Sequence, residues 1–131
     1  MEKNILKKTE VVDESFKESN YVSERIFAES HDGVMIPISI VRHVDTELNE
    51  STPLLLYGYG SYGITNDPRF SSTRLSLLNR GFVYATAHIR GSEYYGRKWY
   101  EDGKLFKKKN TFFDFVACAK HLINILSLIH I

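Results

Sequence analysis

The chain contains 131 residues, of which 43% are hydrophobic and 25% are charged, and its formal net charge at pH 7 is +1. This composition is typical of an ordered globular domain, or of part of one, and excludes a disordered chain. A near-neutral chain has no general attraction to nucleic acid or to an anionic membrane. The longest apolar run, at 122–131, is also shorter than the roughly 20 residues that a membrane span requires. We therefore expect neither a nucleic-acid nor a membrane partner.

The lone cysteine, Cys118, excludes a disulfide within the chain and suits a reducing compartment. Its apolar neighbours at helical spacing indicate a buried thiol. The first eight residues contain no apolar stretch of signal-peptide length, so secretion is not indicated. Three consecutive lysines at 107–109 form a basic run, and short runs of this kind usually form a solvated surface.

The N-terminal quarter of the sequence predicts an arm followed by a hairpin. Residues 1–20 are polar and charged with scattered apolar positions, which is typical of a linker. An Asp-Gly turn at 31–33 lies between β-rich runs at 25–28 and 34–41, and this arrangement predicts a β-hairpin. Because Pro37 has no backbone N–H, we expect an edge or bulged position for it.

The next segments predict a strand, a helix and a second strand. The continuous apolar run at 53–57 is typical of a strand that is buried on both faces in a parallel sheet. Asp67 followed by Pro68 predicts the N-cap and first turn of a helix, and Gly81 predicts its end. The apolar run at 82–87 predicts the following strand.

The C-terminal part predicts a long loop and a helix. The segment 88–109 is rich in aromatic and charged residues, which is typical of a binding loop held by a rigid sheet. Thr111 and Asp114 have the spacing of a capping box and predict a helix start. Its apolar face is expected from Phe112, Phe115, Val116, Ala119, Leu122 and Ile123. Together these elements predict an α/β fold.

The glycine-rich turn at 58–63 formally matches G-x-G-x-x-G after a strand, which is the pattern of a dinucleotide site. The residues at 64–68 do not continue a helix whose amides could receive a pyrophosphate. Tyr59 and Tyr62 also occupy positions where bare backbone would approach the phosphates. We therefore disfavour a dinucleotide site and expect no cofactor, and the histidine spacings predict no metal site.

The same turn has a second chemical interpretation. A tyrosine hydroxyl at the carboxyl end of a parallel strand can stabilise the oxyanion of an acyl-transfer intermediate. The alternative, that the tyrosines simply pack a loop, is equally compatible with the residue types.

Seven ordered segments resemble the oligopeptidase B branch of the prolyl oligopeptidase family of serine peptidases, also called the protease II branch: 21–25, 32–34, 55–63, 74–78, 80–85, 99–104 and 108–112. The similarity extends from about Thr9 to Ile123. It implies a cytoplasmic peptidase that cleaves short peptides after arginine or lysine, built from a β-propeller lid and an α/β-hydrolase domain. The implied fold class is α/β, a partial α/β-hydrolase fold with the N-terminal hairpin, the first parallel strands and two helices.

The resemblance also implies a domain organisation. Residues 1–20 would be a linker from a missing propeller domain, 21–124 the N-terminal part of the peptidase domain, and 125–131 a divergent tail. The sequence would then be truncated before the nucleophile elbow, and losing the fifth strand of the order 1-2-4-3-5 would leave 53–57 as an edge strand that invites aggregation.

Three site residues follow from the resemblance. Tyr59 matches the family tyrosine whose hydroxyl helps to form the oxyanion hole, and Tyr62 matches an aromatic residue near the primary specificity pocket. Asp67 matches an acid linked to basic side chains of the substrate. Arg69 stands where the branch has a second acid, which would repel a cationic substrate. Around Glu93 the family usually has a glycine triplet that this sequence lacks.

The catalytic triad has no counterpart in this sequence. No G-x-S-x-G elbow occurs, and Ser61 precedes the wrong helix to serve as the nucleophile. We expect the chain to be inactive alone, with activity restored by a complementary C-terminal fragment if one exists. The alternatives are a non-catalytic peptide-binding module and a non-functional remnant of a split gene.

Overall fold

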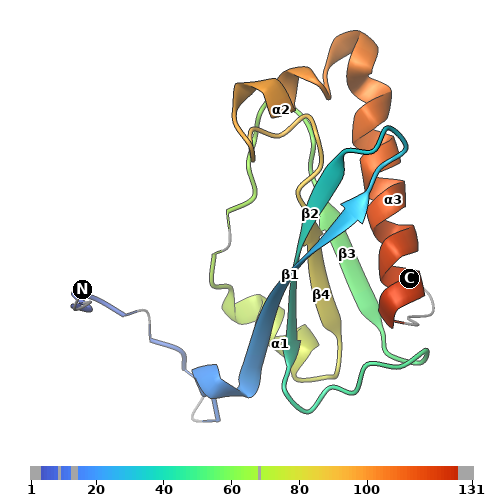
Figure 1. The fold of residues 1–131 in the computed structure, drawn as a ribbon. Coiled ribbons are helices and arrows are strands. Elements are labelled where there is room, and N and C mark those ends of the chain that lie inside the picture. Colours follow the sequence, from blue (N-terminus) through green and yellow to red (C-terminus); the bar gives the residue numbers. More distant parts are fainter. Residues whose placement is uncertain (1–3, 9, 13–14, 68, 127–131) are drawn as a thin grey trace.

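The computed structural model describes residues 4–126 apart from 9, 13–14 and 68. It contains a four-stranded sheet in the order β1-β2-β4-β3, with the long helix α3 beside it (Figure 1). The strands are β1 Tyr21–Glu29, β2 Met35–His43, β3 Leu54–Gly58 and β4 Val83–Ala87. The α-helices are α1 Ser72–Leu78, α2 Arg97–Glu101 and α3 Lys108–Leu126, and 3-10 turns span Glu18–Asn20 and Leu105–Lys107.

The predicted hairpin is confirmed. Strands β1 and β2 pair antiparallel, and Gly33 in the connecting turn has a φ of 78°, in the left-handed region that glycine adopts without steric cost. The expected edge position of Pro37 is wrong, because β2 lies between β1 and β4. The sheet tolerates the proline because pairing of β2 with β4 begins one residue later, at Ile38. The Pro37 carbonyl still accepts a 2.9 Å hydrogen bond from the His88 backbone N–H.

Strand β3 pairs in parallel with β4 and lies at the edge of the described sheet, as expected for the run at 53–57. Its burial on both faces was predicted wrongly. Leu54 and Leu56 are each 9% exposed, whereas Leu55 and Tyr57 are 36% and 43% exposed. Side chains alternate across a strand, so only the face of β3 that points to the core is covered.

The hydrophobic core lies between one face of the sheet and α3. Its buried members are Ala28, Ile36, Ile38, Ile40, Leu54, Leu56, Val83, Ala85, Ala87, Ile89, Cys118 and Leu122. The burial predicted for the cysteine thiol is confirmed, and this burial raises its pKa to about 12.

The start and the apolar face of α3 differ from the prediction. The helix begins at Lys108, so Thr111 and Asp114 lie inside it and form no capping box. Phe112, Val116 and Ile123 are 63%, 49% and 55% exposed, so half of the predicted apolar face points away from the core. The physical reason is that α3 uses Thr111 and Asp114 as buried polar contacts on the side where apolar residues were expected.

Helix α1 also begins later than predicted. Asp67 is not its N-cap, because Ser71 occupies that position and makes no side-chain capping bond. The backbone instead turns at Asp67, whose carbonyl accepts a 2.8 Å hydrogen bond from the Arg69 N–H. Pro68 lies outside the described residues. The helix ends close to the predicted stop: its last residue is Leu78, its C-cap is Asn79, and Gly81 has a φ of 83° in the turn that follows.

The segment predicted as a long loop, 88–109, is only partly irregular. It contains α2 and the 3-10 turn, and its last two residues already belong to α3. The residues 127–131, which make up most of the predicted tail, lie outside the described part of the chain, whereas Ile125 continues α3.

Candidate functional site

Two turns lie side by side where the parallel strands β3 and β4 end. The turn at 58–63 follows β3 and the turn at 88–92 follows β4. The Gly63 N–H donates a 3.1 Å hydrogen bond to the Gly91 carbonyl, and Gly63 forms an isolated parallel bridge with Ser92. This is the edge at which α/β sheets place their ligand sites.

The backbones of these two turns also contact a third loop, at Gly103. A Cβ on Gly91 would overlap the Gly60 carbonyl, and a Cβ on Gly103 would overlap the Gly91 backbone nitrogen. A Cβ on Gly60 would lie 2.6 Å from the Arg90 carbonyl oxygen. Glycine is therefore required at these three positions, because the backbones approach too closely for any side chain. These backbone contacts restrain the turn that carries Tyr59.

The first turn of α3 forms hydrogen bonds to the segments that contain Gly60, Gly91 and Gly103. The Thr111 hydroxyl donates to the Arg90 carbonyl at 2.8 Å and to the Gly103 carbonyl at 3.1 Å. The Lys108 ammonium donates to the Gly60 carbonyl and, at 2.9 Å, to the Ser61 hydroxyl. The solvated surface predicted for 107–109 is thus wrong for Lys108, whose pKa is lowered by burial. A generic charge run carries no signal that distinguishes this lysine from its neighbours.

Arg90 connects the end of β4 to α3 and to the hairpin turn. Its guanidinium donates to Asp114 at 2.9 and 2.7 Å and to Asp32 at 2.6 and 3.1 Å. The Ser30 hydroxyl gives Asp114 a further hydrogen bond of 2.6 Å. Burial opposes the charge on Arg90, but the bonds to Asp114 and Asp32 outweigh it and raise the arginine pKa, while the bond from Arg90 lowers the pKa of Asp32.

Sequence reasoning did not identify this network. The signal for it is a charged residue, Asp114, at a position where the helical spacing of Phe115, Cys118 and Leu122 demands an apolar one. A fully buried carboxylate needs a counter-charge, and Arg90 supplies it.

Tyr59 and Tyr62 both lie on the turn that follows β3. Their side chains are 36% and 83% exposed, and neither hydroxyl donates to or accepts from another described residue. Tyr62 has a φ of 56°, a left-handed conformation that is uncommon for a bulky residue. The side chain of Glu93 lies next to this turn, because a Cβ on Gly63 would be 3.0 Å from its Oε1 atom.

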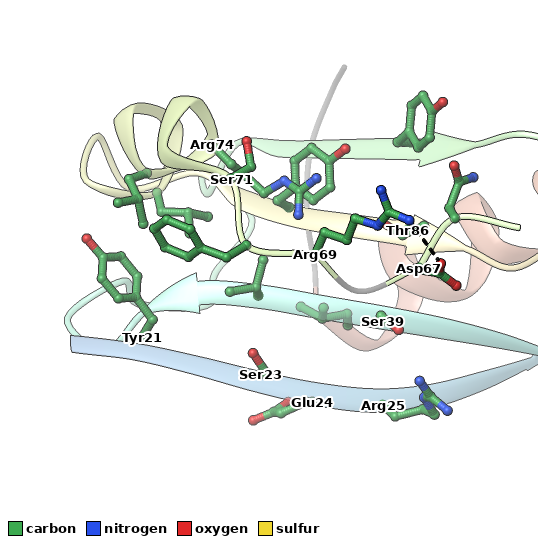
Figure 2. A pocket seen from close by; sticks show the side chains of 18 of the residues that line it. Tyr21, Ser23, Glu24, Arg25, Ser39, Asp67, Arg69, Ser71, Arg74 and Thr86 are labelled. Atoms are coloured by element: carbon green, nitrogen blue, oxygen red, sulfur yellow. Dashed lines mark ion pairs between the residues drawn. The ribbon is translucent and has the colours of Figure 1, made fainter. Parts of the chain in front are cut away.

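Asp67 lies in a different place, a cavity of about 620 Å³ between the second face of the sheet and the segment at 66–74. Figure 2 shows its carboxylate facing Arg69, and the two side chains form an ion pair of 3.5 Å. Tyr59 and Tyr62 do not line this cavity. The three predicted site residues are therefore not brought together in one pocket, and the acid that would bind a substrate cation already has a cationic partner.

The described residues contain no cluster of three or more histidine, cysteine, aspartate and glutamate side chains that could hold a metal ion. Within the same part of the chain, no helix combines the length and the apolar character that crossing a membrane requires.

Comparison with known proteins gives matches over most of the chain. The profile of the prolyl oligopeptidase family matches residues 68–129. Dipeptidyl aminopeptidase BI of Pseudoxanthomonas mexicana is 50% identical over 106 residues, which are 80% of this chain and 15% of that protein. Protease 2 of Moraxella lacunata is 48% identical over 109 residues, which are 83% of this chain and 16% of that protein.

Solved structures agree with these matches. Oligopeptidase B from Leishmania major superposes with a TM-score of 0.85 and 46% identity, covering 91% of this chain and 17% of that one. Oligopeptidase B from Trypanosoma brucei, solved with covalently bound antipain, gives a TM-score of 0.80 and 49% identity over 84% of this chain and 16% of that one.

The fold and these matches define part of an α/β-hydrolase domain of the kind found in prolyl oligopeptidase family peptidases. The chain is similar in sequence and structure to members of the oligopeptidase B branch, which confirms the predicted resemblance. It spans about 15% of the length of the curated relatives that it matches.

Proposed function

We propose that residues 21–124 form the N-terminal part of the peptidase domain of a cytoplasmic serine oligopeptidase that cleaves short peptides after arginine or lysine. In this proposal residues 1–20 lead from a propeller domain, and 125–131 form a divergent tail. The serine, aspartate and histidine of the triad would come from a C-terminal part of the enzyme, which is the partner that the proposal requires. The observation that carries the proposal is that the Tyr59 hydroxyl makes no hydrogen bond to another described residue, while close contacts fix the backbone of its turn.

The chemistry assigned to Tyr59 is oxyanion stabilisation. When a serine oxygen attacks the substrate carbonyl carbon, the π electrons of the carbonyl move onto its oxygen, and a hydroxyl aimed at that position donates a hydrogen bond to the new negative charge. Such a donor is effective when it needs no reorganisation at the moment of reaction. The hydrogen bonds from Lys108 and the close contacts at Gly60 and Gly91 support this role, since they hold the turn in place.

Peptide binding is supported by solved relatives. Prolyl oligopeptidase B from Galerina marginata has been solved with 25-residue and 35-residue peptide substrates bound. For this chain we propose that Tyr62 contacts the substrate next to the cleaved bond and that Asp67 contacts a basic side chain. Because Arg69 pairs with Asp67, the preference for a further basic residue should be weaker than in a relative that has an acid at this position.

The test is a chimera of protease 2 from Moraxella lacunata in which the 109 matched residues are replaced by those of this chain. We expect the chimera to hydrolyse a benzoyl-arginine amide. Tyr59→Phe should lower its kcat about 100-fold with little change in KM, since one oxyanion donor contributes roughly that factor. Tyr95→Phe is the matched control, because Tyr95 is another exposed tyrosine that does not line the cavity of Asp67, and it should have no effect.

Two results would contradict the proposal. An active chimera whose kcat is unchanged by Tyr59→Phe would remove the oxyanion role. A folded chimera that cleaves after proline and not after arginine would remove the proposed specificity.

A further inference from the structure

The two faces of the sheet differ in chemistry. One face forms the apolar core under α3, whereas the other carries a row of polar side chains that crosses all four strands. The registers place Arg25 opposite Ser39, Ser39 opposite Thr86, and Thr86 opposite Tyr57. A mixed sheet with antiparallel strands can leave such a polar face open to water or to a polar ligand.

The polar row forms the floor of the 620 Å³ cavity, and the segment at 66–74 with the start of α1 forms its opposite wall. Figure 2 shows Arg69 and Arg74 entering from this wall and Arg25 rising from β1. Val41, Tyr84 and Leu75 add an apolar portion. We call this site the second-face groove.

Two arginines of the groove have no acidic partner within the described part of the chain. Arg74 is half-buried, and its guanidinium lies 4.2 Å from the centre of the Tyr84 ring; that of Arg25 lies 5.5 Å from the Tyr94 ring. Such contacts orient a guanidinium without neutralising its charge.

The acids that line the groove are already paired. Glu18 pairs with Lys8, Glu24 with Arg42 and Asp67 with Arg69. The groove therefore has two unneutralised positive charges, on Arg25 and Arg74.

We infer that the second-face groove binds an acidic polypeptide segment, with carboxylates on Arg25 and Arg74 and apolar side chains against Val41, Tyr84 and Leu75. Arginine suits this role because its planar guanidinium binds a carboxylate through two parallel hydrogen bonds. The Thr86 hydroxyl on the floor of the groove can bond to the peptide backbone, whereas the Ser39 hydroxyl already shares a 2.8 Å hydrogen bond with Nε2 of His88. The volume is in the range of roughly 300–1,000 Å³ that suits an organic ligand and far exceeds the size of an inorganic anion.

The test uses the full chain and a fluorescein-labelled peptide of the sequence Glu-Leu-Glu-Glu-Leu-Glu, with binding followed by fluorescence anisotropy. We expect saturable binding that weakens about tenfold in Arg74→Gln, which removes a partly buried charged hydrogen bond. Arg25→Gln should weaken binding about threefold, because this arginine is exposed. Arg80→Gln is the matched control: it changes the net charge equally, lies outside the groove and should leave the affinity unchanged.

Several outcomes would overturn the inference. The first is the absence of saturable binding by a chain whose circular-dichroism spectrum is that of a folded protein, and the second is equal weakening by Arg80→Gln. The third is equal binding of a Lys-Leu-Lys-Lys-Leu-Lys peptide. The fourth is displacement of the acidic peptide by inorganic phosphate at a molar concentration equal to that of the peptide. If a glutamine variant does not fold, Arg74→Lys replaces it; the charge remains but the paired hydrogen bonds are lost, and a threefold weakening is expected. Tyr59→Phe should bind the peptide normally, so failure of the peptidase proposal remains distinguishable.

Discussion

Arg90 and Asp114 form a two-point ion pair inside the protein, with donor–acceptor distances of 2.9 and 2.7 Å, and the two residues are 3% and 0% exposed. The pair joins the turn after β4 to α3, and Asp32 extends it to the hairpin turn. Because both charges are removed from water, each depends on the other. The geometry of the turns above β3 and β4 thus depends on a contact between residues far apart in the sequence.

Asp114→Asn should lower the free energy of unfolding by about 3 kcal/mol, since it leaves the buried Arg90 charge without its main counter-charge. Urea denaturation monitored by circular dichroism measures this change. Asp45→Asn is the control, because the side chain of Asp45 is 87% exposed and its loss should change stability by less than about 0.5 kcal/mol. Equal effects of the two substitutions would show that the buried pair contributes nothing specific.

Gly91→Ala should destabilise the chain by at least about 2 kcal/mol, because its Cβ would overlap the Gly60 carbonyl at a φ of 98°. Gly96→Ala separates the effect of the steric overlap from the effect of the positive φ. Gly96 has a φ of 86° but no atom within 4 Å of its added Cβ, so only the backbone term of about 1 kcal/mol remains. Thermal unfolding of both variants provides the comparison, and a smaller loss at Gly91 than at Gly96 would contradict the close approach of the loops.

The stability of the fold should fall between pH 6.5 and pH 4 because of His88. Burial, aided by the Arg25 charge, lowers the pKa of this histidine to about 4 from its ordinary 6.5. The folded state therefore favours the neutral form of His88. The stability that this preference contributes is complete above pH 6.5, the pKa of the unfolded chain, and is lost as the pH falls toward 4, the pKa in the folded chain. The shift corresponds to about 3 kcal/mol over the whole window. Unfolding free energies at several pH values should show this slope in the parent chain and lose it in His88→Gln.

Cys118 should not react with a thiol-specific disulfide reagent at pH 8 while the chain is folded. Its side chain is fully buried, and burial raises the thiol pKa to about 12, so almost no thiolate forms. In urea the thiol should react within minutes, and its reaction rate at intermediate urea concentrations should follow unfolding. Rapid reaction of the native chain would show that α3 opens locally.

The fold was predictable where local signals agreed with the tertiary structure. The Asp-Gly turn determined the hairpin, and the apolar runs at 53–57 and 82–87 located the parallel strands. The helix starts were less accessible, because Thr111 and Asp114 match a capping box in sequence although the tertiary structure uses both for contacts with the turn after β4. A local pattern cannot reveal that Arg90, more than 20 residues earlier, binds the carboxylate.

The candidate site was predictable in part for a similar reason. A glycine-rich turn after a strand exposes its side chains, so the location of Tyr59 and Tyr62 followed from the sequence. The second-face groove did not, because Arg25, Ser39 and Thr86 belong to three strands and only the register of the sheet aligns them.

The contact of Gly60, Gly91 and Gly103 affects how this region can evolve. The three backbone segments share one packing constraint, so none of them can acquire a side chain at its contact point unless another segment moves away. Variation should instead accumulate at outward positions such as Tyr62, which is 83% exposed. The outward side chains of the turns could thus change while the backbone beneath them stays the same.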